Sequence, residues 1–259
     1  MGFLNFKKNV LSRFNLNLNA YKENQLKRRL DSLMSRKKIA ADDYQGFFNL
    51  LTNDRKAYND FLDTITINVS EFFRDKNMFD HLEKNSLPSL LASRNTLKVW
   101  SAACSIGAEP YSIAIILDER SPGRRHIIEA TDIDRNILHT ASLGKYNPDQ
   151  IRNVNPSRLS RYFKNDGRFY HLDDRIKKMV TFRQHDLLLE TFGQGYDLII
   201  CRNVTIYFTK EAQDRLNAKF YKSLNPGGLL FIGASEMLFN YHEIGFEKIA
   251  SCFYRKKSG

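Results

Sequence analysis

The sequence predicts an α/β protein: a helical domain over residues 1–80, then a Rossmann-like sheet over residues 81–259 with a small β-subdomain inserted at about 161–182. Three observations predict this. Apolar residues recur at helical spacing in the first part, whereas after residue 96 short apolar runs alternate with helical patterns. Such alternation is typical of a parallel sheet whose strands are joined by helices. Residues 161–182 fit neither pattern and are too long for a simple connection.

The first 80 residues carry the spacing of amphipathic helices. Leu26, Leu30 and Leu33 follow the period of a helix, and no segment there alternates like a strand. We therefore expect helices throughout this part. Residues 85–96 contain Pro88, and we interpret them as the linker that ends the helical domain.

The remainder of the chain reads as strands and helices in turn. Short apolar runs bounded by turn residues are typical of strands that are buried on both faces. We expect such strands at residues 97–100, 126–133, from 180, at 197–201 and at 229–233. Helices are expected between them at residues 110–120, 134–143 and 210–224.

Local signals mark several ends of these elements. Pro110 suits the first turn of a helix, because its missing N–H has no partner there. Asp134 is expected to cap the helix that follows it, and Gly144 to end that helix. Residues 225–228, Asn-Pro-Gly-Gly, predict a turn before the fifth strand.

Two antiparallel hairpins complete the expected fold. Residues 246–250 and 252–255 are too close together for a crossover helix, so we expect them to form an antiparallel edge of the sheet. Within the insertion, Asn165, Asp166 and Gly167 predict a tight turn between two short strands.

The composition is that of a globular protein with a basic surface. The apolar content is 42%, the net charge is +11, and no apolar run approaches the ~20 residues of a membrane span. A basic chain prefers acidic partners: nucleic acid, anionic lipid or an acidic protein surface. Cys104, Cys201 and Cys252 form no close pair, which argues against a metal site or disulfides, and we expect a cytoplasmic protein.

The loop after the first strand indicates which ligand the sheet holds. A dinucleotide would need G-x-G-x-x-G there, because a pyrophosphate must approach bare backbone. This loop instead has one glycine, Gly107, and an acid, Glu109. A carboxylate repels a pyrophosphate but suits S-adenosylmethionine, which has a sulfonium and an ammonium and no phosphate. Glu109 is equally explained as a first-turn acid that stabilises its helix, and the two roles can coexist.

The second strand ends in a further acid, Asp132. An acid at this point of a Rossmann-like sheet commonly binds ribose hydroxyls. Asp132 is therefore the candidate ribose ligand, whereas Asp134 is better explained as a helix cap.

Five segments carry recognisable motifs: residues 68–74 (NVSEFFR), 100–112 (WSAACSIGAEPYS), 130–134 (ATDID), 201–208 (CRNVTIYF) and 224–228 (LNPGG). Together they resemble the chemotaxis receptor methyltransferases, the CheR family. The resemblance covers nearly the whole chain in the family's order and spacing. The FFR, EPYS and CRNVxIYF motifs are specific to this family among methyltransferases.

The resemblance implies a fold and an activity. The fold would be an S-adenosylmethionine-dependent methyltransferase sheet with an N-terminal all-helical domain and an inserted β-subdomain. The activity would be methyl transfer from S-adenosylmethionine to glutamate side-chain carboxylates of methyl-accepting chemotaxis receptors, forming methyl esters and S-adenosyl-L-homocysteine.

The resemblance also implies the site residues. Arg74 and Tyr207 would be catalytic, and Asn68, Ser70 and Arg74 would reach the cofactor from the helical domain. The implied cofactor-binding residues are Asn68, Ser70, Arg74, Glu109, Asp132, Asp186, Leu187, Asn203 and Val204.

Four positions depart from the family's usual residues. Ile106 and Ala108 stand where the family usually has Thr and Glu, and Asp186 replaces a common Asn. Ser70 replaces a common Thr and keeps the hydroxyl. Because Glu109 is kept, we expect these changes to affect affinity more than activity.

The chemistry of such a transfer needs no general base. A glutamate carboxylate has a pKa of about 4.3 and is already ionised at neutral pH. We therefore expect the histidines to be structural or exposed. Arg74 is suited to hold a carboxylate in a bidentate fork, and Tyr207 to orient a group by its hydroxyl. Without the resemblance, a surface salt bridge is the favoured interpretation of Arg74 and a buried aromatic that of Tyr207.

A basic segment is the candidate partner surface. Lys22, Arg29 and Arg36 recur every seven residues and so share one helix face. A charge run is usually a solvated face, but receptor methylation helices are acidic, so docking through this face is expected. We expect a monomer that is recruited to membrane receptor clusters, with no membrane insertion and no nucleic-acid partner.

Two other classes of protein share features with this sequence. The basic charge also suits a nucleic-acid methyltransferase, but amino-methylating enzymes of that kind often carry Asn/Asp-Pro-Pro-Tyr after the fourth strand, where this chain has Arg202, Asn203 and Val204. A non-catalytic S-adenosylmethionine-binding scaffold or sensor is the other alternative. Ile106 and Ala108 keep it open, and Arg74 and Tyr207 count against it.

Overall fold

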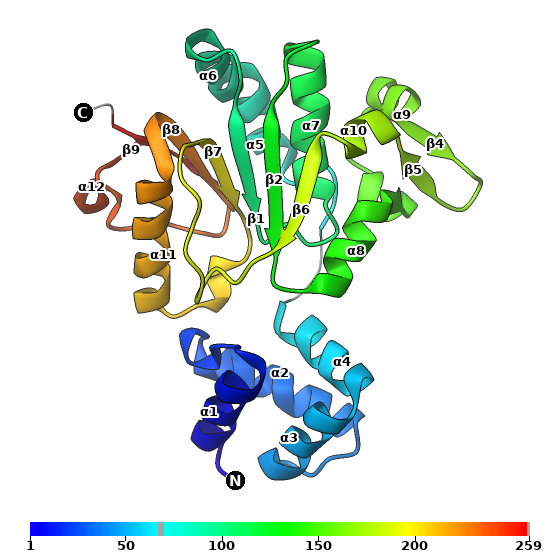
Figure 1. Cartoon of the computed structure of the whole chain (residues 1–259), viewed down its shortest axis with the longest axis vertical. Coiled ribbons are helices and arrows are strands. Elements are labelled where there is room, and N and C mark those ends of the chain that lie inside the picture. Colours follow the sequence, from blue (N-terminus) through cyan, green and yellow to red (C-terminus); the bar gives the residue numbers. More distant parts are fainter. Residues whose placement is uncertain (67–69, 258–259) are drawn as a thin grey trace. The chain divides into compact units, whose positions relative to one another are not determined.

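The chain forms two compact units. A computed structural model describes residues 1–66 and 70–257 (Figure 1). The first unit comprises Met1–Asn68 and Val204–Arg215, and the second comprises Val69–Asn203 and Leu216–Gly259. The helical unit thus ends before the predicted boundary at residue 80 and includes a segment from the second half of the chain.

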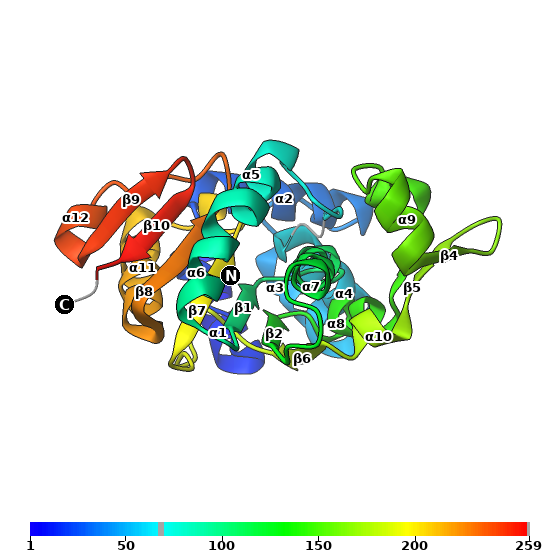
Figure 2. The same cartoon turned by 90° about the horizontal axis from the view of Figure 1, so that it is seen from above.

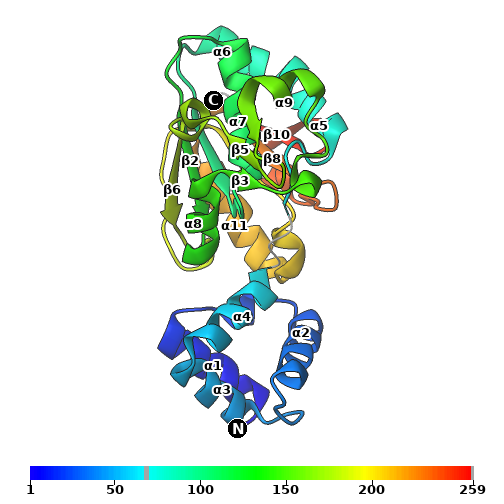
Figure 3. The same ribbon diagram turned by 90° about the vertical axis from the view of Figure 1, so that its right-hand side faces the viewer.

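The first unit is built from four amphipathic helices, drawn in blue in Figure 3. Leu26, Leu30 and Leu33 are all buried, which confirms the predicted helical spacing. Aromatic side chains fill the rest of the interior, where the Phe47 ring lies 5.6 Å from that of Phe6 and 6.1 Å from that of Phe61. The helices are α1 (Phe3–Phe14), α2 (Glu23–Arg36), α3 (Tyr44–Asn53) and α4 (Arg55–Thr66), with a 3₁₀ turn η1 (Leu18–Ala20).

The second unit contains a seven-stranded sheet in the order β6-β2-β1-β7-β8-β10-β9 (Figure 2). The five strands from β6 to β8 are parallel, and β10 pairs antiparallel with both β8 and β9. The predicted Rossmann-like sheet with an antiparallel edge is therefore confirmed. The strands are β1 (Lys98–Ala102), β2 (Ile127–Asp132), β6 (Val180–Gln184), β7 (Tyr196–Cys201), β8 (Leu224–Ile232), β9 (Phe246–Ala250) and β10 (Phe253–Lys256).

The predicted helices of the sheet are present, with the predicted signals at their ends. Pro110 lies in the first turn of α7 (Ala108–Arg120). The Asp134 carboxylate accepts the Asn136 N–H at 2.8 Å and caps α8 (Arg135–Leu143), and Gly144 ends that helix with a φ of 63°. The third predicted helix is α11 (Lys210–Ser223), and a short helix that was not predicted, α12 (Tyr241–Ile244), precedes β9.

The prediction of a linker at residues 85–96 is wrong, because these residues are mostly helical. A continuous helical run comprises α5 (Lys76–His81), a π-helical turn η2 (Leu82–Ser86) and α6 (Leu87–Ser93). A proline inside an α-helix lacks one N–H and clashes with the carbonyl four residues earlier. The wider π turn lies directly before Pro88 and accommodates it. Buried leucines, among them Leu82, Leu87 and Leu90, hold the run in place.

The turn expected at residues 225–228 lies inside β8 as a bulge. Leu224 pairs with Tyr196 and Leu229 with Leu198, so the residues between them stand opposite Asp197 alone. Gly227 has a φ of 75°, which accounts for the glycine signal in the sequence.

The insertion is larger than its predicted bounds. The hairpin of β4 (Phe163–Asn165) and β5 (Tyr170–Leu172) is confirmed, and Gly167 lies in its turn with a φ of 94°. A third strand, β3 (Lys145–Tyr146), pairs with β5 and was missed because two residues leave no periodic signal. The subdomain also holds η3 (Pro148–Ile151), α9 (Pro156–Tyr162) and α10 (Asp174–Lys177).

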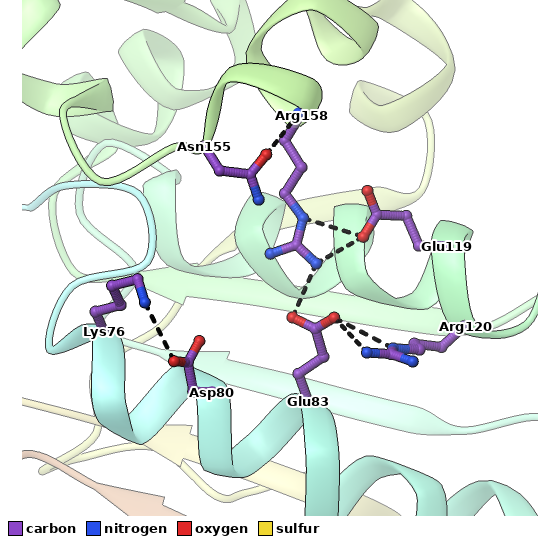
Figure 4. A network of polar contacts seen from close by, with 7 residues as sticks. All are labelled: Lys76, Asp80, Glu83, Glu119, Arg120, Asn155 and Arg158. Carbon is purple, nitrogen blue, oxygen red and sulfur yellow. Dashed lines mark hydrogen bonds and ion pairs between the residues drawn. The ribbon is translucent and has the colours of Figure 1, made fainter.

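A charged network joins the subdomain to the rest of the second unit (Figure 4). Arg158 of α9 donates to Glu119 of α7 at 2.6 Å and to Glu83 of η2 at 2.8 Å. Glu83 also accepts from Arg120 at 2.8 Å. Because Arg158 is mostly buried and doubly paired, it fixes α9 against two other elements of this unit.

Candidate active site

The loop after β1 is held in an unusual backbone conformation. Ala103, Ser105 and Gly107 have φ values of 61°, 50° and 80°. Residues other than glycine rarely adopt a positive φ, and backbone strain of this kind is common at functional sites. This loop lies at the carboxyl end of β1, where the sheet order reverses between β2 on one side and β7 on the other. Ligands of open α/β sheets bind at that point.

Asp132 ends β2 and is bonded to the same loop. One carboxylate oxygen accepts the Ser105 N–H at 2.9 Å and the other accepts the Asp134 N–H at 3.1 Å. Burial raises the pKa of Asp132 to about 6, although these backbone donors oppose the shift. The structure thus places a buried acid beside the first loop, at the end of the strand where ribose ligands are expected.

Glu109 stands in the first turn of α7 and is paired. Its carboxylate accepts the Ser101 hydroxyl at 2.8 Å and lies 3.4 Å from Nη1 of Arg202. Burial raises the pKa of Glu109, and Arg202 and Ser101 oppose that shift. Because α7 begins at Ala108, Glu109 also has the helix-stabilising position that the sequence allowed.

Arg202 is central to the site, although no role was assigned to it from the sequence. Its side chain is only 2% exposed, and Nη2 donates to Asp75 at 2.6 Å and to the Arg74 carbonyl at 3.1 Å. Its guanidinium also lies 4.7 Å from the centre of the Phe231 ring. Arg202 therefore connects Glu109 with the turn that carries Arg74. The one sequence feature that points to Arg202 is its position directly after the strand β7.

Ser70 and Arg74 belong to the second unit, not to the helical domain from which they were expected. The backbone N–H of Phe72 donates to Gln150 and that of Phe73 to the Ser112 hydroxyl, at 2.8 and 3.0 Å. Phe73 and Asp75 have φ values of 51° and 59°. Arg74, half-buried, thus stands on a strained turn that its neighbours anchor. Asn68 lies outside the described residues.

Asn203 follows β7 and is fixed by an acid that sequence reasoning missed. The buried Glu236 carboxylate accepts the N–H groups of Asn203 at 2.9 Å and of Gly233 at 2.7 Å. Asn203 has a φ of 61°. A Cβ on Gly233 would lie 2.9 Å from the Asn203 nitrogen, so this close approach requires glycine. Glu236 gave no signal because it lies in a loop far along the chain.

Asp186 and Leu187 follow β6 and are both buried. One oxygen of Asp186 accepts the Leu188 N–H at 2.7 Å, whereas the other is buried without a hydrogen-bond partner among the described residues. The Ser105 hydroxyl is buried without such a partner as well. Unsatisfied buried polar atoms are costly unless a ligand completes them. The unpaired oxygen of Asp186, next to the apolar Leu187 in the chain, and the Ser105 hydroxyl of the loop after β1 fit a cofactor with a polar nucleoside.

Val204 and Tyr207 belong to the first unit. The Tyr207 carbonyl accepts the Lys22 N–H at 2.9 Å, and the Arg29 guanidinium lies 4.3 Å from the centre of the Tyr207 ring. Tyr207 itself lies in a 3₁₀ turn, η4 (Thr205–Tyr207), and is half-buried. The predicted basic face of α2 and the predicted catalytic tyrosine are thus neighbours.

The described residues offer neither a metal site nor a membrane-spanning helix. In the part of the chain that the structure describes, no group of three His, Cys, Asp or Glu side chains is arranged to hold a metal ion. No helix within residues 1–66 or 70–257 is long and apolar enough to cross a membrane. Cys104, Cys201 and Cys252 are buried, and burial raises the pKa of the Cys104 and Cys201 thiols.

The fold, with Glu109 in the first turn of α7 and Asp132 at the end of β2, defines the class: an S-adenosylmethionine-dependent methyltransferase. A family model described as the CheR methyltransferase, SAM binding domain, matches residues 68–254, and one described as its all-alpha domain matches residues 1–66. The chain belongs to the CheR methyltransferase family.

Individual relatives agree with this assignment. A chemotaxis protein methyltransferase of Listeria innocua is 43% identical over 98% of this chain and 97% of the relative. Chemotaxis protein methyltransferase 1 of Pseudomonas aeruginosa is 38% identical over 69% of each chain. A solved TehB-like SAM-dependent methyltransferase from Corynebacterium glutamicum is 14% identical over 70% of this chain and 94% of its own, with a TM-score of 0.39, a level too low to support any comparison of function.

The elevated pKa of Asp132 predicts a pH dependence of cofactor binding. If the charged carboxylate binds the ribose, lowering the pH from 7.0 to 5.5 should weaken S-adenosylmethionine binding about fourfold, the ratio of ionised fractions for a pKa near 6. Calorimetric titration of the wild type and of Asp132→Asn would measure this. The variant should bind more weakly at pH 7.0 and lose the Asp132 part of the pH dependence. An equal pH dependence in both proteins would refute the prediction.

The stability of the ligand-free protein should change in the opposite direction. The pKa of Asp132 is raised from 3.8 to about 6 on folding, so the group favours the folded state most when it is protonated. Its contribution is full below about pH 4 and is lost as the pH rises through about 6.

Proposed function

We propose that this chain transfers the methyl group of S-adenosylmethionine to glutamate side-chain carboxylates of chemotaxis receptors, forming methyl esters. The near-full-length similarity to chemotaxis protein methyltransferases carries the proposal. The nucleic-acid and non-catalytic alternatives have no comparable support.

The residues of the second unit fit the cofactor. Glu109 would hold its ammonium group and Asp132 its ribose hydroxyls. Asp186, whose second oxygen is buried and unpaired within the described structure, would bind the adenine beside Leu187. Ser70 and Asn203 would complete the pocket in this unit, and Asn68 and Val204 are proposed as further cofactor-binding residues.

Bound S-adenosylmethionine supplies an activated methyl group next to a sulfonium charge. The protein's part is then positioning and charge, because the acceptor glutamate is already ionised at neutral pH. Arg74 would hold a carboxylate in a bidentate fork, and Tyr207 would orient the acceptor by its hydroxyl. Positioning of this kind can lower the activation barrier by about 7–11 kcal/mol in favourable cases.

The test is transfer of labelled methyl groups to receptor-containing membranes. We expect label on the receptors that mild base releases, because esters hydrolyse under those conditions and N-methyl groups do not. Membranes without receptors and added nucleic acid are the controls. Base-stable label, or label on nucleic acid alone, would refute the proposed function.

The basic face of α2 is the proposed docking surface, recruiting the enzyme as a monomer to receptor clusters. Lys22 and Arg36 are exposed, whereas Lys37 is paired with Asp60. Arg29 stacks on Tyr207, so an acidic receptor helix bound along α2 would approach the proposed catalytic tyrosine. Each exposed contact should contribute about 0.2–1 kcal/mol, and salt should screen all of them.

A further inference from the structure

Two exposed apolar side chains stand in the loop after β8. Phe239 is 73% exposed and Met237 is 62% exposed, the highest values among the large hydrophobic residues of the described structure. Single exposed hydrophobic residues are common on protein surfaces. Two of them separated by a single residue indicate a binding surface only if the loop is ordered and lies close to the cofactor site.

The loop of residues 233–240 is ordered by hydrogen bonds between Gly233 and Glu236 and by the burial of Leu238. The Glu236 carboxylate accepts the Gly233 N–H at 2.7 Å, and the Glu236 N–H donates to the Gly233 carbonyl at 3.0 Å. Leu238, between the two exposed residues, is buried with 4% exposure. With Leu238 turned inward, its neighbours on both sides are turned outward.

The loop also borders the cofactor site. It follows the carboxyl end of β8, which pairs in parallel with β7. Glu236 binds the backbone N–H of Asn203, the residue at the carboxyl end of β7. Met237 and Phe239 therefore project into solvent beside the edge of the sheet where the methyl group would be transferred.

We propose that Met237 and Phe239 contact apolar residues that border the exposed face of the receptor helix that carries the target glutamate, an inference that rests on the proposed function. A glutamate on a helix reaches the site only with its neighbours three and four residues away, which share its helix face. A helix on the surface of a protein turns an apolar stripe toward its own core, so apolar residues border its exposed face. The loop carries no exposed charge between Gly233 and Asn240, because its acid is buried. It is thus suited to an apolar contact with such a helix.

The test compares two double variants by receptor methylation. Met237→Ser with Phe239→Ser should raise the KM for receptor membranes about tenfold. The reason is that the variant loses the apolar surface that the wild type buries against the receptor helix on binding. S-adenosylmethionine affinity and kcat should remain near wild type. Ile127→Ser with Leu143→Ser is the matched control, because these residues are 53% and 54% exposed on other elements of the same unit.

A salt series separates this contact from electrostatic docking. The KM defect of the loop variant should persist at high salt, whereas that of Lys22→Glu with Arg36→Glu should shrink as wild-type docking is screened. An unchanged KM in the loop variant, or an equal rise in the control, would overturn the inference and leave the proposed function intact. Failure of the wild type to label receptors would instead overturn both.

Discussion

Arg74→Ala should reduce methyl transfer by about 100-fold or more, the cost of removing one well-placed donor from an active site. The fold should survive, because the turn is held by backbone N–H groups of Phe72 and Phe73 and not only by this side chain. Initial rates with receptor membranes, with circular dichroism as a check on folding, would measure the effect. Tyr207→Phe should have a smaller effect, because it loses only the hydroxyl.

Arg152→Ala is the matched control for Arg74. Arg152 pairs with Glu71 at 2.6 Å, close to the same turn, but its side chain is 66% exposed. Its loss should leave turnover near wild type. If Arg74→Ala does the same, Arg74 is another surface ion-pair residue and its proposed catalytic role is wrong.

Arg202→Met should lower the free energy of unfolding by about 3–5 kcal/mol, as expected when one partner of a buried ion pair is removed. Methionine would fill much of the space beside Phe231, so the loss would come mainly from the uncompensated carboxylate of Glu109. Urea unfolding of the ligand-free protein would measure it. Adding Glu109→Gln should recover part of the loss, because the second change removes the orphaned charge.

Arg120→Met provides the comparison for Arg202. Arg120 also binds a glutamate, but it is 45% exposed, and its partner Glu83 keeps Arg158 (Figure 4). Its loss should therefore cost no more than about 1 kcal/mol. Equal effects of the two substitutions would show that the Arg202 pair contributes no more than a surface contact.

The sequence by itself determined the elements whose signals are local. The leucine spacing of α2, the Asp134 cap, Gly144 and the turn at Gly167 each depend on residues within a few positions, so each could be predicted and each is present. Motif resemblance then supplied the family and the cofactor. The roles of the site residues remain predictions for the experiments above.

Only the tertiary structure decided which side chains are buried together. Arg202 meets Asp75 across 127 positions, and Glu236 meets Asn203 across 33, so no local pattern marks either pair. The π turn before Pro88 is similar: local signals predicted a break, but buried leucines keep the helical run intact. The physical reason is the same in each case. Caps and turns are satisfied by neighbouring backbone groups, whereas burial and charge pairing depend on distant segments that only the folded chain brings into contact.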